Sequence, residues 1–303
     1  MPELPEVETI ARDLDAAVVG AMVTAVWGSG LPLHLKRAVD LTGIRRLAVG
    51  RRIASVRRKG KYLLLAFDQS ARARSSAALD QSRVLAGVAS GVVAHLGMSG
   101  RLRVEPASAE RVRHTHVVFT LGDGRELRFI DPRRFGWMAP GAPLDTRPEL
   151  MALGPDPLTE LDEAALASAL ADVRAPIKAF LLDQKRIAGL GNIYVSEALH
   201  RAGIHPVTPA ARVVNRAGPL LAGIRASLEL GIRNRGTTLR DYVDASGTRG
   251  DNAAALRVYG REGQPCPVCA SVIRRRVDAG RSTFFCAGCQ HRSAARTSST
   301  RRR

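Results

Sequence analysis

Two of the first three residues of the chain could carry out chemistry at a sugar carbon. The chain opens MPELPEVE, and removal of the initiating methionine would leave Pro2 as an N-terminal secondary amine. A free α-amino group has a reference pKa of about 8, so part of it is unprotonated at neutral pH and can attack an aldehyde carbon. The resulting iminium ion is cationic without an added proton, and Glu3 could transfer protons as the sugar ring opens. The rest of the stretch is typical of a helix start, and the apolar spacing predicts a helix over residues 6–19.

The four cysteines form a second group with chemical potential. They lie in two C-x2-C pairs separated by residues 270–285, namely Cys266, Cys269, Cys286 and Cys289. This spacing is typical of a structural zinc ion held by four thiolates from two tight turns. Two disulfides or a redox pair are the alternatives, but the sequence shows no other cysteine and no secretion signal. We therefore expect one Zn²⁺ with no open coordination position, which performs no hydrolysis.

Two turns carry groups that suit nucleic acid. The GLGN turn at residues 189–192 precedes a predicted helix, and free amides at a helix N-terminus together with the Asn192 side chain form a site for one phosphate. A helix cap is the alternative role for this asparagine. The DPRRFG turn at residues 131–136 joins two arginines to a phenylalanine. Proteins use arginine and an apolar wedge to fill a base stack after a nucleotide is extruded, although such a turn is also common without that role.

The charge balance predicts a polyanionic partner. The 303 residues include 46 Lys and Arg against 28 Asp and Glu, a net charge of +18, and nucleic acid is the commonest partner for such an excess. Aromatic residues make up 4%, which argues against a channel that stacks single-stranded bases. We find no apolar run that could cross a bilayer and no heptad repeat. We therefore expect a monomer without a membrane partner, in the cytoplasm and associated with the nucleoid.

Hydrophobic spacing predicts an α+β chain. Residues 1–140 are expected to form an N-terminal β-sandwich with a flanking helix, because short apolar runs alternate with Gly-rich turns. The expected strands are 22–27, 52–56, 62–67, 92–96, 102–105, 116–121 and 127–130, and residues 69–90, rich in Ser, Ala and Arg, are expected to be a flexible insertion.

The period becomes helical from residue 154. Helices are expected over 162–173, 177–184, 192–201 and 219–233, which would form a helical domain over residues 154–240. Residues 241–258 have no strong period and are expected to form a loop. Residues 259–290 then form the four-cysteine ribbon, with a hairpin over 272–285, and residues 291–303 a disordered basic tail.

The order of these motifs resembles that of the formamidopyrimidine-DNA glycosylases. The similar segments are MPELPEVE, KGKYLL (59–64), HLGMSG (95–100), DPRRFG (131–136), GNIYVSE (191–197) and the cysteine ribbon. The resemblance implies a base-excision repair glycosylase that removes oxidised purines, 8-oxoguanine and formamidopyrimidines, from damaged double-stranded DNA. It also implies an abasic-site lyase that nicks the strand by β,δ-elimination. The implied fold is a β-sandwich, a helix–two-turn–helix DNA-binding domain at 154–240, a lesion-recognition loop at 241–258 and a zinc ribbon.

The resemblance implies catalytic roles for four residues. Pro2 matches the Schiff-base nucleophile and Glu3 its acid–base partner. Lys61 matches a lysine near the lesion and its phosphate, whereas by residue type alone it would be a surface lysine. Arg281 matches an arginine that the ribbon hairpin presents to the phosphates beside the lesion, where it assists the second elimination.

The resemblance also implies DNA contacts. Met98, Arg133 and Phe135 match the wedge residues that fill the gap left by the extruded nucleotide, with Arg133 facing the orphaned cytosine. Core packing is the alternative role for the methionine. Four further positions match phosphate contacts: His95, His114, Arg134 and Asn192. A lone histidine is more often structural, so the histidine assignments rest on the resemblance.

Two alternatives remain open. An endonuclease VIII-like glycosylase shares the fold and Pro2 but acts on oxidised pyrimidines, and Leu4 together with the Arg133 and Phe135 wedge favours the purine branch. A noncatalytic zinc-ribbon DNA-binding protein would fit the charge and the cysteines equally well. The Pro2-Glu3 pair distinguishes the two classes, because a binding module has no use for a free secondary amine.

Overall fold

The structure is a computed structural model that describes residues 1–34, 38–68, 90–239 and 242–291. It comprises two compact units. The first unit consists of Met1–Asp156, Ile187–Gly189 and Leu228–Ala255, and the second of Pro157–Arg186, Leu190–Ser227 and the chain from Leu256 onward. The predicted insertion, apart from Ser90, and the predicted basic tail, apart from His291, lie outside the described residues.

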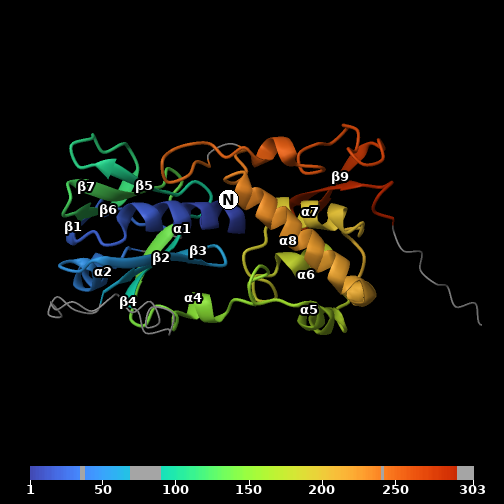
Figure 1. Cartoon of the computed structure of the whole chain (residues 1–303), viewed down its shortest axis with the longest axis horizontal. Helices are drawn as coiled ribbons and strands as arrows, with labels where there is room; N and C mark the ends of the chain where they lie inside the picture. Colours follow the sequence, from blue (N-terminus) through green and yellow to red (C-terminus); the bar gives the residue numbers. More distant parts are fainter. Residues whose placement is uncertain (35–37, 69–89, 240–241, 292–303) are drawn as a thin grey trace, which may run out of the picture. The chain divides into compact units, whose positions relative to one another are not determined.

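The first unit contains two four-stranded antiparallel sheets. One sheet has the strand order β1-β6-β7-β5 and the other β2-β3-β4-β8. Apolar side chains of both sheets share one hydrophobic core with helix α1, which lies alongside the strands (Figure 1). This is the predicted sandwich with a flanking helix. The strands are β1 (Val23–Gly28), β2 (Ile53–Lys59), β3 (Tyr62–Phe67), β4 (Ser90–His95), β5 (Arg101–Pro106), β6 (Thr115–Leu121), β7 (Arg125–Ile130) and β8 (Trp137–Gly141).

Helix α1 (Leu4–Val18) begins two residues before the predicted start. Glu3 is its N-cap and forms a reciprocal capping box with Glu6, so the first turn includes the proline at position 5. Its apolar face is fully buried, and burial of each such side chain stabilises the fold by roughly 1.5–3 kcal/mol relative to exposure. The helix that follows Pro2 is therefore anchored in the main core.

Four elements of the first unit were not predicted, and one of them is the 3-10 helix η2 (Asn252–Ala255) within the expected loop. Helix α2 (Leu41–Ala48) buries only three apolar residues and contains a glycine, so its pattern is too short to stand out. Strand β8 contains Pro140, which is tolerated because this strand lies at the sheet edge beside β4. Helix α4 (Pro148–Met151) has only four residues and begins with a proline at its first position.

The second unit is mainly helical and carries the cysteine hairpin. Its helices are α5 (Glu163–Leu170), α6 (Ile177–Leu182), α7 (Asn192–Arg201) and the 3-10 helix η1 (Ala210–Arg216), while α8 (Ala217–Arg233) contributes residues to both units. The hairpin pairs β9 (Ile273–Asp278) with β10 (Arg281–Cys286). The predicted α+β class is confirmed. Within the described ranges, no helix is both long enough and apolar enough to cross a membrane.

Candidate functional site

Pro2 and Glu3 lie at the start of α1 in the first unit, and both are buried. The Glu6 carboxylate holds the backbone at this point from two sides. Its Oε2 accepts the N–H of Glu3 at 2.8 Å, and its Oε1 accepts the N–H of Thr237 at 2.7 Å. Glu6 therefore ties the chain next to Pro2 to the segment that follows α8. The sequence pattern places Glu6 only at the helix start, because the partner in this second contact lies 231 positions away.

Gly189 brings the N-terminus close to the turn between β2 and β3. The Leu4 N–H donates to the Gly189 carbonyl at 3.0 Å, and a Cβ on Gly189 would lie 2.7 Å from the Leu4 side chain. A Cβ on Gly60, in the turn, would lie 3.6 Å from the Gly189 nitrogen. Lys61 follows in this turn and is only 7% exposed, so the surface-lysine interpretation is wrong.

A pocket of about 660 Å³ in the first unit gathers most of the predicted DNA contacts. Met98 and Phe135 are 43% and 45% exposed, so the core-packing interpretation of Met98 is wrong. Met1 lines the same pocket at 54% exposure. The residues around it are Met1, Pro32, Leu33, His34, His95, Gly97, Met98, Arg133, Arg134 and Phe135.

The loop after β7 carries Arg133 and Phe135 of the predicted wedge. The buried Asp131 carboxylate at its start holds the loop through hydrogen bonds. Asp131 Oδ1 accepts the Ser99 hydroxyl at 2.6 Å, and its Oδ2 accepts the N–H of Gly136 at 2.7 Å. The Arg133 guanidinium lies 4.8 Å from the centre of the Phe135 ring, within the range of a cation–π contact. The arginine and the phenylalanine are therefore exposed as one stacked pair.

Arg134 lies in this loop, and His114 lies in a segment that is hydrogen-bonded to it. Both have a left-handed backbone, with φ of 68° and 54°. The His114 carbonyl accepts the N–H of Asp131 at 3.0 Å. Arg134 lines the pocket, whereas His114 does not.

His95 is a neutral hydrogen-bond donor at neutral pH. Burial, reinforced by the charges of Lys61 and His34, lowers the pKa of His95 to about 4. Its Nδ1 accepts the N–H of Gly97 at 3.1 Å, so the proton of the neutral ring is on Nε2. This arrangement leaves one N–H that can donate to a phosphate oxygen.

In the second unit, the hairpin brings Asn192 and Arg281 together. The Asn192 Nδ2 donates to the Ser282 carbonyl at 2.9 Å, and its Oδ1 is buried without a hydrogen-bond partner among the described residues. The N-cap of α7 is Gly191, so the helix-cap interpretation of Asn192 is wrong. Arg281, the residue before Ser282, is exposed.

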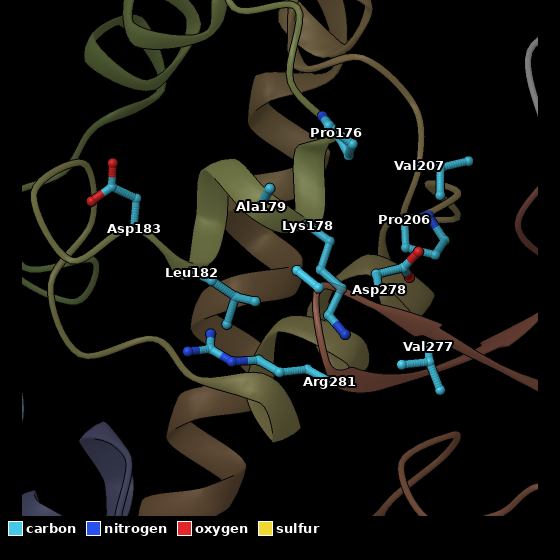
Figure 2. A pocket seen from close by; sticks show the side chains of 11 residues that line it. Pro176, Lys178, Ala179, Leu182, Asp183, Pro206, Val207, Val277, Asp278 and Arg281 are labelled. Atoms are coloured by element: carbon cyan, nitrogen blue, oxygen red, sulfur yellow. The ribbon is translucent and has the colours of Figure 1, made fainter.

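Sequence analysis did not identify Lys178, which is 4% exposed in α6. Its Nζ donates to the Ser282 carbonyl at 3.1 Å and to the Thr283 hydroxyl at 2.6 Å, and this hydroxyl donates to Asp278 at 2.7 Å. Figure 2 shows Lys178 extending from α6 toward the end of the hairpin that carries Asp278 and Arg281. These residues line a pocket of about 710 Å³. The available signal was a lysine in the otherwise apolar stretch IKAFLL.

The four cysteines fit a structural zinc ion. Their sulfur atoms all lie within 4.8 Å of one another. Three of the sulfur–sulfur distances, Cys266–Cys289, Cys269–Cys286 and Cys269–Cys289, are 3.4–3.8 Å. Tetrahedral Zn–S bonds of about 2.3 Å require sulfur separations of this size. A disulfide of about 2.05 Å is excluded by these separations, so the disulfide alternative is wrong. The predicted single zinc site is confirmed.

Two side chains of α7 support the zinc ribbon. Glu197 accepts three successive backbone N–H groups, from Arg257, Val258 and Tyr259, at 2.9–3.0 Å. The His200 Nε2 lies 3.4 Å from the Cys266 sulfur. The ribbon is therefore attached to the helix that carries Asn192.

The chain matches three family models. They describe the formamidopyrimidine-DNA glycosylase N-terminal domain over residues 1–138, the H2TH domain of the same enzymes over residues 153–243, and a zinc finger found in FPG and IleRS over residues 263–292. The formamidopyrimidine-DNA glycosylase of Rhizorhabdus wittichii is 44% identical over 294 residues, which cover 96% of this chain and 100% of that protein.

Solved structures are similar over nearly the whole chain. The MutM (Fpg) protein of Thermus thermophilus superimposes with a TM-score of 0.79 and is 38% identical, with 95% of this chain and 98% of that chain covered. Lactococcus lactis Fpg bound to DNA with an abasic site gives a TM-score of 0.81 at 28% identity, with 96% and 100% covered. The same Lactococcus protein has been solved with DNA containing an oxidised pyrimidine.

Proposed function

Because the chain belongs to the formamidopyrimidine-DNA glycosylase family, we propose that it removes oxidised purines from double-stranded DNA in base-excision repair and then nicks the strand as an abasic-site lyase. Its substrates are 8-oxoguanine and formamidopyrimidines. The observation that carries this proposal is the pocket in the first unit, where His95, Arg133 and Phe135 surround the space that Met1 also lines.

The proposed nucleophile is the amine of Pro2 after removal of Met1. Met1 is exposed at the pocket and Pro2 is buried behind it, so loss of Met1 would uncover the amine. The Pro2 nitrogen bonds to C1′ of the damaged nucleotide while the bond from C1′ to the base breaks. The C1′–O4′ bond then breaks as the sugar ring opens, and Glu3, next to this nitrogen in the chain, donates the proton that O4′ takes up. The iminium ion then draws electrons from the C2′–H bond, which drives β-elimination and afterwards δ-elimination of the two flanking phosphates.

The remaining residues of the first unit position the DNA. Lys61 lies beside the N-terminus and His95, where a cation favours a phosphate. His95, His114 and Arg134 contact phosphates. Met98, Arg133 and Phe135 fill the space that the extruded nucleotide leaves.

The second unit supplies further phosphate contacts. The Arg281 side chain is exposed and forms no hydrogen bond or ion pair within the described part of the chain, so its five donors are available to DNA. The amides at the start of α7, with Asn192, bind another phosphate. The zinc ion holds the ribbon and takes no part in bond breaking.

Oxidised pyrimidines are the second candidate substrate, because a relative has been solved with DNA that contains one. Residues 248–255 of the proposed lesion-recognition loop, 241–258, read TRGDNAAA and provide no aromatic side chain over an extruded base. We propose that the protein works as a monomer on nucleoid DNA in the cytoplasm. The charge of +18 supports a DNA partner.

Borohydride trapping tests the proposal. The duplex carries one 8-oxoguanine opposite cytosine, and the protein is compared with a form in which a tag precedes Pro2. We expect a covalent adduct that maps to Pro2 and is lost when the tag blocks its amine. If only an oxidised-pyrimidine duplex is cut, the substrates are oxidised pyrimidines and not oxidised purines. If DNA is bound without any cutting or trapping, the protein is a noncatalytic DNA-binding protein.

A further inference from the structure

His34 contacts the backbone of the loop that carries the predicted wedge, residues 131–136, which we call the wedge loop. The contacts of His34 are at two consecutive residues. Its own N–H donates to the Gly136 carbonyl at 3.2 Å, and its ring Nδ1 lies 3.1 Å from the Phe135 carbonyl oxygen. A carbonyl oxygen can only accept, so Nδ1 carries a proton and donates. One residue, from a segment about a hundred positions earlier in the chain, therefore holds both carbonyls.

These two bonds complement those of Asp131. The Asp131 carboxylate accepts the N–H groups of Arg133 and Gly136, at 3.3 Å and 2.7 Å. It therefore holds the backbone N–H groups of the loop. It cannot hold the carbonyls, because a carboxylate has no donor. His34 supplies the missing donors where the loop carries Phe135.

The opposite side of the loop is also constrained. A Cβ on Gly97 would lie 2.5 Å from the Phe135 carbonyl carbon and from the Gly136 nitrogen, so the 95–98 turn packs directly on this backbone. The Phe135 ring itself is 45% exposed. The orientation of the ring therefore depends on how firmly its backbone is held, rather than on packing around the ring.

We propose that His34 is a positioning residue for the Phe135 and Arg133 wedge, and that it acts in extrusion of the damaged nucleotide. The inference rests on the proposed function. Extrusion loses base pairing and stacking, and an inserted wedge recovers part of this cost only if it enters the stack at the correct angle. A wedge that lacks its carbonyl anchors samples other angles and recovers less.

Two variants at position 34 test this role, with one control. His34→Ala removes the ring donor, while His34→Asn places an amide N–H at about the position of Nδ1 and should restore the bond. Leu31→Ala is the control, because Leu31 is 51% exposed in the same segment and does not line the pocket. Single-turnover rates are measured on an 8-oxoguanine duplex and on a duplex with a preformed abasic site.

We expect His34→Ala to slow base release from 8-oxoguanine about tenfold, the effect of losing one ordinary hydrogen bond in the transition state. Strand cutting at the abasic site, where no base is extruded, should change less than about twofold. His34→Asn and Leu31→Ala should resemble the natural protein. Equal slowing on both substrates, or no slowing on either, would overturn the proposal.

A binding measurement separates failure of this inference from failure of the proposed function. The duplex carries a stable tetrahydrofuran site opposite 2-aminopurine, whose fluorescence reports wedge insertion without any catalysis. We expect His34→Ala to reduce the fluorescence change at saturating protein and His34→Asn to restore it. An unchanged signal in His34→Ala would refute the role of His34 even in a protein that cuts no DNA.

Discussion

At the scale of single residues, the first unit uses polar groups that are partly or fully buried to fix protons and backbone, and the partly buried His95 is the clearest case. The pKa of His95 is lowered to about 4 by burial first and by neighbouring charge second. Its Nδ1 accepts from Gly97, which leaves Nε2–H as the only donor. A phosphate contact by His95 is therefore a neutral hydrogen bond and not an ion pair.

The lowered pKa of His95 predicts a dependence of stability on pH. Because the folded pKa lies below the unfolded value of about 6.5, the unfolded chain binds more protons between these values, and the free energy of unfolding falls as pH drops through this window. His95→Gln should make the slope between pH 6.5 and 5 shallower by up to about 1.4 kcal/mol per pH unit. Urea unfolding at several pH values measures it. The exposed His291→Gln is the control, and equal slopes in His95→Gln and the natural protein would contradict the assignment.

Glu6 gives a second prediction at this scale. Glu6→Gln keeps one carbonyl oxygen but turns an amide N–H toward either Glu3 or Thr237, so one of the two bonds is replaced by a donor–donor contact. We expect borohydride trapping at least about tenfold slower, because the backbone beside Pro2 moves. Arg12→Gln, exposed on the same helix, should trap at the natural rate. Normal trapping by Glu6→Gln would show that these bonds do not position the N-terminus.

At the scale of elements, the hairpin of β9 and β10 depends on Lys178 in α6. The Ser282 carbonyl accepts from both Lys178 and Asn192, and it directly follows Arg281. Two residues, the predicted Asn192 and the newly identified Lys178, therefore share one acceptor next to Arg281. The position of the exposed arginine is set by a buried lysine.

Lys178→Met should consequently weaken DNA binding about tenfold, since it removes two hydrogen bonds that hold the hairpin beside Arg281. Binding to an abasic-analogue duplex is measured by fluorescence anisotropy. Lys185→Met removes the same charge from an exposed position in the same unit. Equal weakening in both variants would mean that only the net charge matters.

Elements with a long apolar period could be predicted, and those that depend on distant partners could not. The α1 pattern, every sandwich strand up to β7, α7 and the cysteine hairpin all have clear spacing, and they lie within a few residues of the predicted ranges. Strand β8 is identified only by pairing with β4, and the roles of Lys178 and His34 only by carbonyls 104 and 101 positions away. Residue type signals a reactive amine or a thiolate, but it does not reveal which backbone groups a side chain will hold.

At the scale of the whole molecule, the sandwich and the zinc ribbon have cores of very different size. The sandwich core includes residues of α1, α2 and both sheets, whereas the buried core of the ribbon consists of Val258, Cys266, Ile273 and Cys286. So small a cluster cannot offset the entropy of ordering the ribbon without the metal. The zinc ion therefore determines whether the Arg281 hairpin forms.

Removal of zinc should abolish specific DNA binding while the first unit stays folded. A chelator strong enough to empty a four-thiolate site is applied, and loss of metal is verified by elemental analysis. Binding is followed by anisotropy, and the sandwich by the fluorescence of Trp27 and Trp137, both in its strands. Tight binding by a verified zinc-free protein would show that the ribbon is dispensable.

The contacts of the N-terminus have a consequence for the order of synthesis. Leu4 bonds to Gly189 and Glu6 to Thr237, so the first residues to leave the ribosome wait for partners that are made late. A nascent chain that ends at Asp156 already contains both sheets but lacks these two partners. The backbone beside Pro2 is then held by neither contact. The position proposed for the Pro2 amine is therefore reached only after residue 237 has been made, and no N-terminal fragment that stops before this residue can reproduce it.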